Sequence, residues 1–291
     1  MTAVVSKIRT ILEMIKFEHT VFALPFALTS AILAADGLPE IVVLFWILVA
    51  MVGARSAAMA FNRIADLHYD KLNPRTSSRA LPAGILTLTE AWAFTIIAAG
   101  IFIFAAWMLN PLAFALSPVA LLVILGYSYT KRFTTLSHLV LGLALGIAPV
   151  GAWIAVTGHL GLAPIILSAV VMFWTAGFDV IYALQDLEFD DKLGLFSIPK
   201  ALGPAKGLLV SRLFHGLSSL LLVGYGLVLG LGVIYYIGVG LVSLLLAYEQ
   251  SLVKPNDFSK VNVAFFNING FVSIGFFVVT AVDLAVRKGL F

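Results

Sequence analysis

Long apolar segments, separated by short polar stretches, run through almost the whole chain. A helix that spans a membrane needs about 20 mostly apolar residues, and nine segments approach or exceed this length. Turn-forming residues separate consecutive apolar segments at Pro111, between Gly158 and Gly161, and between Gly230 and Gly232. The predicted spanning helices are residues 20–36, 41–62, 88–109, 111–129, 135–157, 161–184, 207–230, 232–250 and 263–285.

The apolar pattern continues without a low-complexity segment or a linker between domains. We therefore expect a single membrane-embedded domain over residues 1–291, built only from α-helices. Residues 1–17 combine basic and acidic side chains with apolar ones on one side. This combination predicts an interfacial amphipathic helix rather than a cleaved signal peptide.

The composition also indicates an integral membrane protein. Hydrophobic residues make up 61% of the chain and charged residues 11%, whereas soluble domains contain about 25% charged residues. The mean hydropathy is +1.05. The chain has no cysteine, which excludes disulfides, thiolate catalysis and cysteine-based zinc sites.

Lysine and arginine are distributed unevenly among the loops. The loops after the first, third, fifth and seventh predicted helices contain neither residue, whereas the other four contain several. Because positively charged loops stay in the cytoplasm, we expect these four loops and the N-terminus to be cytoplasmic, in a cell inner membrane. Arg287 and Lys288 fall on the opposite side, which is a minor conflict or a sign of one miscounted helix. The basic residues of the four loops are Arg63, Lys71, Arg75, Arg79, Lys131, Arg132, Lys192, Lys200, Lys206, Lys254 and Lys260.

Two polar clusters lie where strongly apolar segments end, and their spacing matches. Carboxylates at membrane depth cost about 2.5–3.5 kcal/mol each on insertion scales, so such a cluster is a candidate functional site. The four-residue step from Asp66 to Asp70 recurs from Asp186 to Asp190, which suggests a weak internal repeat. The first cluster is Asn62, Asp66 and Asp70, and the second is Asp179, Tyr182, Gln185, Asp186 and Asp190.

On a continuous helix, the acidic members of each cluster share one face. Like charges one turn apart repel unless a cation neutralises them. Mg²⁺ prefers oxygen ligands and commonly bridges carboxylates to substrate phosphates, and Arg or Lys side chains bind further phosphate charge. Ordinary surface acids would explain one cluster, but two matched clusters on one membrane face favour a metal–diphosphate site. The basic candidates nearby are Arg75, Arg79, Lys131 and Arg132, with Tyr127 shortly before the last two.

Arg55 differs from the other basic residues because it lies inside an apolar segment. It precedes Asn62 by two helical turns on the same face. An arginine at this depth needs an anionic partner. The partner is either a motif carboxylate reached by snorkelling or a substrate carboxylate bound by both arms of the guanidinium.

Together these motifs resemble the UbiA family of intramembrane aromatic prenyltransferases, over nearly the whole chain. The nine-helix count agrees with the resemblance. One position departs from the pattern: many members have Asn-Asp at the start of the first motif, but Arg63 follows Asn62 here, which removes one candidate carboxylate. The matching stretches are Arg55-Ser56-Ala57, Asn62-(x)3-Asp66-(x)3-Asp70, Arg75-Thr76-(x)2-Arg79-(x)-Leu81-Pro82-(x)-Gly84, Tyr127-(x)3-Lys131-Arg132 and Asp179-(x)2-Tyr182-(x)2-Gln185-Asp186-(x)3-Asp190.

The resemblance implies nine transmembrane helices around a central cavity and a Mg²⁺-dependent transfer of a polyprenyl group from its diphosphate to an aromatic ring. Two Mg²⁺ ions would join the diphosphate to the acidic clusters. Ionisation would leave an allylic carbocation that the ring attacks, and Asp179 or the released pyrophosphate would take the ring proton. The implied metal ligands are Asn62, Asp66, Asp70, Asp186 and Asp190. The implied catalytic residues are Asp66, Asp70, Asp179, Asp186, Asp190 and Lys131. The implied substrate contacts are Arg55, Asn62, Arg75, Arg79, Tyr127, Arg132, Tyr182 and Gln185.

Several alternatives remain open for the acceptor and the class of protein. In similar enzymes the position of Arg55 suits an aromatic acid, which points to 4-hydroxybenzoate in ubiquinone synthesis. A hydroxylated naphthoate in a menaquinone route is the alternative acceptor. A divalent-cation transporter would need polar groups across the whole bilayer, whereas here they gather at one face. A phospholipid-type phosphotransferase would need a Gly-Ala-Arg insert between the first aspartates, which Asp66 to Asp70 lacks. No nucleic-acid partner is expected.

The remaining polar residues in apolar segments are interpreted structurally. We interpret every histidine as an interfacial or loop residue, and we expect His68 to face away from Asp66 and Asp70. Three asparagines near the last helix are predicted to form hydrogen bonds between helices. The histidines are His19, His68, His138, His159 and His215, and the asparagines are Asn262, Asn267 and Asn269.

Overall fold

The computed structural model describes residue 10 and residues 20–290. Within this part of the chain, each of the nine predicted apolar segments is helical. The interfacial helix predicted over residues 1–17 lies outside the described residues except for residue 10, and His19 lies outside them too. The long helices are α2 (Thr20–Ala34), α3 (Ile41–Ala65), α5 (Leu88–Leu109), α6 (Pro111–Thr130), α7 (Ser137–Thr157), α8 (Leu162–Ala183), α11 (Pro204–Leu229), α12 (Val233–Leu252) and α13 (Asn269–Arg287).

Short helical segments lie next to the ends of the long helices. Eight helices in the described residues are long and apolar enough to cross a membrane, and Phe22–Ala34 is a shorter apolar helix. The prediction of an all-α polytopic membrane fold is therefore confirmed. The short segments are α4 (Leu67–Leu72), the 3-10 turn Leu184–Asp186, α9 (Leu187–Lys192), α10 (Ile198–Leu202) and a π-helix (Val263–Ile268) before α13.

The helices form two compact units that alternate along the chain. Of the described residues, unit 1 contains 10, 20 and 45–129, and unit 2 contains 21–44 and 130–290. The first acidic cluster therefore belongs to unit 1 and the second to unit 2. The single domain over residues 1–291 stays a prediction.

In unit 1, a glycine lets α3 approach α5 closely. A Cβ atom at Gly53 would lie 2.9 Å from the Phe102 amide nitrogen. Aromatic rings fill the space nearer the acidic cluster: the centroid of the Phe61 ring lies 5.7 Å from that of Trp92 and 5.8 Å from that of Tyr129. Because lipid gives no hydrophobic drive between helices, close packing of this kind has to hold α3, α5 and α6 together.

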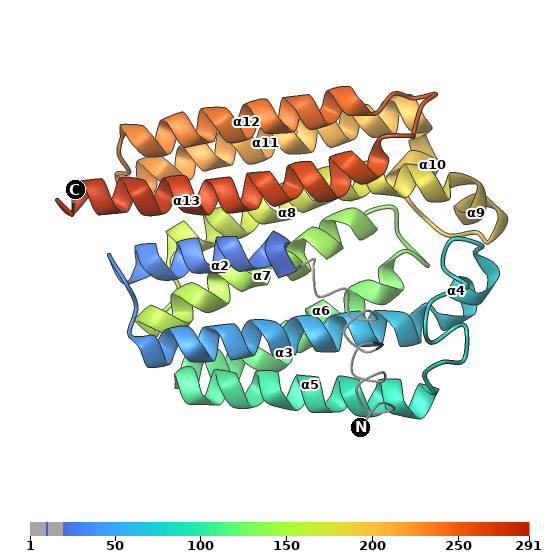
Figure 1. Cartoon of the computed structure of the whole chain (residues 1–291), viewed down its shortest axis with the longest axis horizontal. Coiled ribbons are helices and arrows are strands. Elements are labelled where there is room, and N and C mark those ends of the chain that lie inside the picture. The colour runs from blue at the N-terminus through green and yellow to red at the C-terminus, as the bar shows by residue number, and fades with distance from the viewer. Residues whose placement is uncertain (1–9, 11–19, 291) are drawn as a thin grey trace. The chain divides into compact units, whose positions relative to one another are not determined.

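In unit 2, α7 packs on α8, α8 on α11, α11 on α12, and α12 on α13 (Figure 1). The α7–α8 contact depends on a small residue, since a Cβ atom at Gly142 would overlap the Met172 carbonyl group. The α2 helix is joined to α7 by a hydrogen bond of 2.6 Å from Ser30 Oγ to the Pro149 carbonyl oxygen. Packing and one buried hydrogen bond therefore fix the helices on both sides of α7.

A buried polar network joins α8, α12 and α13. Trp174 Nε1 donates to Asn269 Oδ1 at 2.6 Å, and Asn269 Nδ2 donates to Glu249 Oε1 at 3.1 Å. The same amide group also donates to two carbonyl oxygens of the preceding π-helix. The prediction for Asn269 is confirmed, whereas Asn262 and Asn267 are exposed.

Near the other end of unit 2, a side chain of α13 caps α12. Asp283 accepts hydrogen bonds from the amides of Gly232 at 2.8 Å and Tyr235 at 3.1 Å, which satisfies donors that the first helical turn leaves free. Arg287 Nε lies 3.4 Å from the Asp283 carboxylate, and Arg287 Nη1 donates to the Gly230 carbonyl oxygen at 2.8 Å. The charge of Arg287 is thus neutralised at the α11–α12 turn.

The neighbouring Lys288 forms an ion pair with Asp36, which follows α2. The turns after the first and seventh predicted helices therefore contact the end of the ninth, as the nine-helix count requires. Arg287 and Lys288, which depart from the charge pattern of the loops, therefore both have acidic partners nearby.

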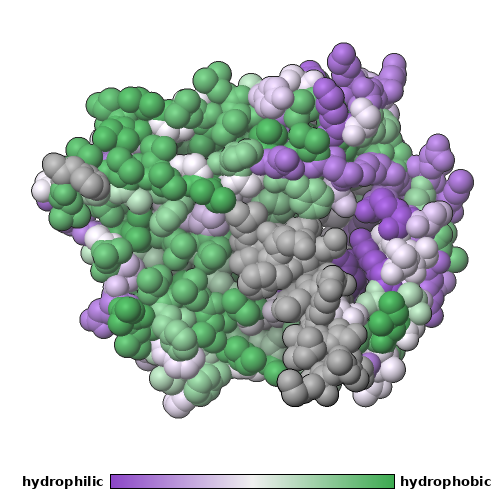
Figure 2. Space-filling view, in the orientation of Figure 1, coloured by the Kyte–Doolittle hydropathy of each residue, from purple (hydrophilic) through white to green (hydrophobic). Residues whose placement is uncertain are grey.

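Large apolar side chains cover the outer face of unit 2. Figure 2 shows hydrophobic residues over the long helices α11 to α13, and hydrophilic residues gathered at the end of this unit where α9 and α10 lie. Exposed leucines recur along α11 and α12, including Leu213, Leu220, Leu227 and Leu244. Exposed apolar surface of this extent is suited to lipid tails.

Replacing Gly142 with alanine is expected to destabilise the protein by about 1–3 kcal/mol, because the added methyl group overpacks the α7–α8 contact. Gly151→Ala is the matched control in α7, where a Cβ atom would meet no heavy atom within 4 Å; it should be neutral or slightly stabilising. Thermal unfolding in one detergent measures both variants. Equal unfolding temperatures would contradict the close contact.

Candidate functional site

The two acidic clusters share a local backbone structure. In unit 1, Asp66 lies between the end of α3 and the start of α4, with φ −90° and ψ 4°. In unit 2, Asp186 directly precedes α9, with φ −106° and ψ 8°. Both aspartates therefore occupy the bridge region of backbone space at the start of a six-residue helix. The repeat suggested by the sequence extends to backbone conformation.

These junctions change the geometry expected from the sequence. Asn62, Asp66 and Asp70 do not lie on one continuous helix, because α3 ends before Asp66, and a 3-10 turn separates α8 from α9. Main-chain hydrogen bonds nevertheless continue across the first junction: the Asp66 amide donates to the Asn62 carbonyl at 2.9 Å, and the Asp70 amide to the Asp66 carbonyl at 2.7 Å. The three side chains stay about one turn apart.

The fourth residue of each short helix is a buried aspartate. Asp70 of α4 is 6% exposed and Asp190 of α9 is fully buried. A buried carboxylate is costly unless a cation compensates it, and each has one. Arg79 Nη1 lies 2.8 and 2.9 Å from the two Asp70 oxygens, and Lys131 Nζ lies 2.8 Å from Asp190 Oδ1.

The loop after α4 folds back so that Arg79 reaches Asp70. Asn73 Oδ1 accepts a hydrogen bond from the Arg75 amide at 2.9 Å, a turn typical of asparagine. The buried Thr76 hydroxyl donates to the Asp70 carbonyl oxygen at 3.1 Å. This fold directs the Arg79 guanidinium to the buried acid and leaves the Arg75 side chain exposed.

Arg63 joins the first cluster from the last turn of α3. It is buried, and its Nη1 lies 3.4 Å from Asn62 Oδ1 and 3.9 Å from Asp70 Oδ2. Asn62 Nδ2 in turn donates to Asp66 Oδ2 at 2.9 Å. The position that departs from the family pattern is thus a cation among the motif residues, where an additional carboxylate would otherwise stand.

Arg55 is half-buried in the interior of α3, deeper than the acidic cluster. Tyr127, near the end of α6, lies within electrostatic range of both Arg55 and Arg63. Tyr127 therefore lies near two arginines of α3.

In unit 2, the segment before α10 surrounds the buried Asp190. The Phe196 amide donates to the Lys131 carbonyl oxygen at 2.7 Å, and Lys200 Nζ donates to the Asp190 carbonyl oxygen at 3.1 Å. Both Asp190 carboxylate oxygens are buried and lack a donor of good hydrogen-bond geometry among the described residues, although Lys131 lies at ion-pair distance. Lys131 is therefore the cation that compensates the buried Asp190 carboxylate.

Asp179 of α8 pairs with His138 of α7. His138 Nδ1 lies 2.7 Å from Asp179 Oδ2, and His138 Nε2 accepts a hydrogen bond from the Ile198 amide at 3.2 Å. Because Nε2 accepts, the proton of a neutral ring is on Nδ1 and is donated to the carboxylate. The backbone at the start of α10 thus selects the tautomer that orients Asp179.

The pairing of His138 with Asp179 is not predicted by the sequence pattern. His138 was interpreted as an interfacial or loop residue, yet it is buried. It lies 41 residues from Asp179, so no helical spacing connects them. The only signal was a histidine at the start of an apolar segment.

The structure also shows where the remaining candidate side chains lie. The Tyr182 ring centroid lies 4.3 Å from that of Phe265, and Gln185 Nε2 donates to the Tyr182 carbonyl oxygen at 3.4 Å. Arg132 is half-buried in the turn after α6. His68 is exposed while Asp70 is buried, so it faces away as expected.

Comparison with known proteins identifies the family. The sequence profile of the UbiA prenyltransferase family matches residues 23–271. This chain belongs to the UbiA prenyltransferase family. The 4-hydroxybenzoate octaprenyltransferase of Vibrio cholerae is 34% identical over 274 residues, covering 92% of this chain and 95% of that protein. The enzyme of the same name from Francisella tularensis is 30% identical over 263 residues, covering 90% of each.

Solved structures confirm the fold of this UbiA-family chain. The apo structure of a UbiA homolog from Aeropyrum pernix K1 aligns with a TM-score of 0.80 and 33% identity, covering 93% of this chain and 98% of that one. A UbiA homolog from Archaeoglobus fulgidus bound to DMAPP and Mg²⁺ aligns with a TM-score of 0.72 and 18% identity, covering 95% and 99%. The chain is a prenyltransferase. It is neither a divalent-cation transporter nor a phospholipid-type phosphotransferase.

The oxygen donors of this UbiA-family chain suit a magnesium ion, which needs few protein ligands. They suit a metal ion whose ligands all come from the protein less well. Among the described residues, no three His, Cys, Asp or Glu side chains form a metal-binding group. Mg²⁺ normally needs just one or two carboxylates, with waters and substrate phosphates completing its shell. Asp66 and Asp70 in unit 1, and Asp186 and Asp190 in unit 2, offer donors of this kind.

Arg79→Gln is expected to destabilise the protein by about 1–3 kcal/mol, because it removes the guanidinium that bonds both oxygens of the buried Asp70. Arg75→Gln, in the same loop but exposed, should change stability by less than about 0.5 kcal/mol. Adding Asp70→Asn to Arg79→Gln should restore part of the loss, since the charge is no longer buried alone. Denaturant unfolding of the four proteins measures these differences. If Arg79→Gln were as stable as Arg75→Gln, the Asp70 pair would not be a stabilising contact.

Proposed function

We propose that this enzyme transfers a polyprenyl group from polyprenyl diphosphate to an aromatic acid of the 4-hydroxybenzoate type, with Mg²⁺ as its cofactor. Relatives described as 4-hydroxybenzoate octaprenyltransferases, 30–34% identical over most of the chain, support the acceptor. Homologue structures described with DMAPP or GPP and Mg²⁺ support the donor and the metal. The observation in this chain that carries the acceptor assignment is Arg55, a half-buried arginine within a membrane-spanning helix.

The acidic residues are assigned to metal binding. Asn62, Asp66 and Asp70 would hold Mg²⁺ from unit 1, and Asp186 and Asp190 from unit 2, with two ions expected from the resemblance. Bound Mg²⁺ would offset the negative charge that develops on the departing diphosphate.

Basic side chains would hold the diphosphate itself. Arg79 and Lys131 compensate buried aspartates, yet their side chains are 28% and 34% exposed, so both retain N–H donors for phosphate oxygens. Arg75, Arg132 and Tyr127 are the further candidates, with Tyr127 donating its hydroxyl proton in a hydrogen bond. Tyr182 and Gln185 are assigned to substrate binding beside the second motif.

Asp179 is the candidate base for the ring proton, and the released pyrophosphate is the alternative. His138 donates to Asp179 Oδ2 and holds the carboxylate in one orientation, so Oδ1 remains to accept a proton. His138 would act as a positioning residue. The Ile198 amide, which donates to His138 Nε2, holds the imidazole ring in the orientation that this contact requires.

The orientation in the membrane is also part of the proposal. The N-terminus and the loops that carry both acidic clusters would be cytoplasmic, in a cell inner membrane, because these loops contain nearly all of the lysines and arginines between helices. A water-soluble acceptor and a lipid-soluble donor would then meet at the membrane surface.

Asp66→Ala and Asp186→Ala are each expected to lower prenyl transfer by about 100-fold or more, since both remove metal ligands. Chelation of Mg²⁺ should abolish the wild-type reaction. Asp191→Ala is the matched control in α9, because its side chain is 80% exposed; it should retain activity. The assay measures labelled polyprenyl diphosphate transferred to 4-hydroxybenzoate by purified enzyme. Full activity of either variant, or of the chelated enzyme, would overturn the metal assignment.

Arg55→Ala is expected to raise the KM for 4-hydroxybenzoate by about 10- to 100-fold with little change in kcat, because a charge-assisted hydrogen bond of about 1.5–3 kcal/mol is lost. Arg55→Lys should be intermediate, since lysine keeps the charge but not the forked geometry. An unchanged acceptor KM would show that Arg55 does not bind the carboxylate. In the same assay, preference for a dihydroxynaphthoate would favour the menaquinone alternative.

A further inference from the structure

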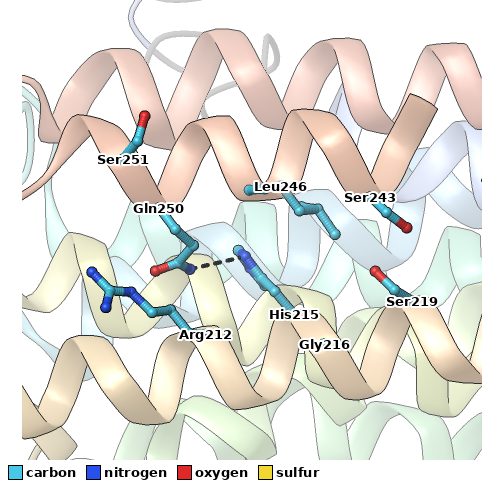
Figure 3. Close-up of a pocket in the computed structure, with 9 residues that line it drawn as sticks. Arg212, His215, Gly216, Ser219, Ser243, Leu246, Gln250 and Ser251 are labelled. Carbon is cyan, nitrogen blue, oxygen red and sulfur yellow. Dashed lines mark hydrogen bonds between the residues drawn. The ribbon is translucent and has the colours of Figure 1, made fainter. Parts of the chain in front are cut away.

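A groove lined largely by polar side chains lies between α11 and α12 of unit 2 (Figure 3). Its volume is about 450 Å³. None of its residues belongs to the acidic motifs or to the proposed mechanism. Its polar lining residues are Arg212, His215, Ser219, Ser243, Gln250 and Ser251.

A hydrogen-bond network fixes the orientation of the Gln250 amide. Gln250 Nε2 donates to Ser211 Oγ at 2.7 Å and to His215 Nδ1 at 3.0 Å. The Ser211 hydroxyl already donates to the Gly177 carbonyl oxygen at 2.7 Å, and His215 Nε2 donates to the Trp174 carbonyl oxygen at 3.3 Å. A flipped amide would place its oxygen against two acceptors, so Oε1 has to point away from this network.

The fixed amide leaves an acceptor without a donor. Gln250 is 8% exposed, and its Oε1 has no hydrogen-bond partner in the described part of the chain. Figure 3 shows this oxygen on the side of Arg212. A buried acceptor in this condition costs free energy until a donor reaches it.

Arg212 supplies the one charged side chain of the groove. No carboxylate lines the groove, and Arg212 forms no ion pair within the described residues. It lies two turns into α11, about 12 Å from the helix start at 1.5 Å per residue, while Gln250 is in the last turn of α12. An arginine at this depth extends toward the lipid head groups.

At two positions, a serine of the groove offers an acceptor oxygen, but its hydroxyl proton is already donated to a backbone carbonyl. The Ser243 hydroxyl donates to the Val239 carbonyl at 2.8 Å and the Ser251 hydroxyl to the Tyr248 carbonyl at 2.6 Å. The groove thus combines one cation with several acceptor oxygens. A matching ligand carries a negative charge and hydrogen-bond donors on the same group.

We propose that this groove binds the head group of an anionic glycerol phospholipid, with the phosphate on Arg212 and the head-group hydroxyls facing Gln250 and the serine oxygens. The guanidinium fork suits phosphate oxygens, and basic pockets between transmembrane helices recruit anionic head groups. Phosphatidylglycerol meets both requirements. Phosphatidylcholine has a phosphate but no hydrogen-bond donor in its head group, so it leaves the acceptors unsatisfied.

Native mass spectrometry of the purified full chain tests the proposal. Phosphatidylglycerol and phosphatidylcholine with identical acyl chains are titrated separately, and glycerol 3-phosphate is added as a soluble competitor. Wild type should retain phosphatidylglycerol in preference to phosphatidylcholine. Arg212→Gln should weaken phosphatidylglycerol binding by about tenfold. Lys206→Gln is the matched control, because Lys206 is an exposed cation of the same helix outside the groove; it should bind like wild type.

Three outcomes would overturn the proposal. Equal retention of the two lipids by wild type would remove the head-group preference, and this measurement does not depend on the folding of any variant. Equal losses in Arg212→Gln and Lys206→Gln would indicate general surface charge. Displacement of the lipid by glycerol 3-phosphate at similar concentration would indicate a site for a soluble phosphate. Partial binding by Arg212→Lys, which keeps the charge, would support the assignment.

Discussion

The site depends on burying a carboxylate at the end of a membrane helix and compensating it with a cation. Asp70 and Asp190 are the two most buried motif acids, and Arg79 and Lys131, respectively, lie close enough to compensate the cost of burying them. This requirement explains the loops around them. The Asn73 turn has to fold back on α4, and the segment before α10 has to bond the backbone of Lys131, because each contact positions a compensating charge.

The two units meet this requirement with the same helix break but with different cations. In each unit an aspartate in the bridge conformation directly precedes the short helix, and the short helix buries the aspartate four residues later. In unit 1 the cation is an arginine from the following loop, which bonds both oxygens of Asp70. In unit 2 it is a lysine from the end of an earlier helix, which approaches one oxygen of Asp190. Lysine acts as a point charge, whereas the arginine fork can engage both carboxylate oxygens at once.

The sequence predicted features that depend on spacing within one segment. It did not predict contacts between residues that lie far apart in the chain. Helix number and the acidic positions followed from apolar length and from spacing within one segment. The break at Asp66 did not, because the four-residue spacing of Asn62, Asp66 and Asp70 is the same on a continuous helix and across a junction that keeps its main-chain bonds. The pair of His138 and Asp179 joins two helices, and periodicity within either helix carries no information about it.

In the apolar interior of this fold, a polar group is costly unless it has a hydrogen-bond partner. Some buried polar groups of unit 2 satisfy one another, as the Trp174 indole and the Asn269 amide do. Where an acceptor is left unsatisfied beside a cation, the missing partner has to come from outside the chain. In the proposed mechanism, Asp190 would ligate the metal while Lys131 binds the anion. In the proposed lipid site, Gln250 offers a neutral acceptor and Arg212 a cation, and a head group with phosphate and hydroxyl together would match both.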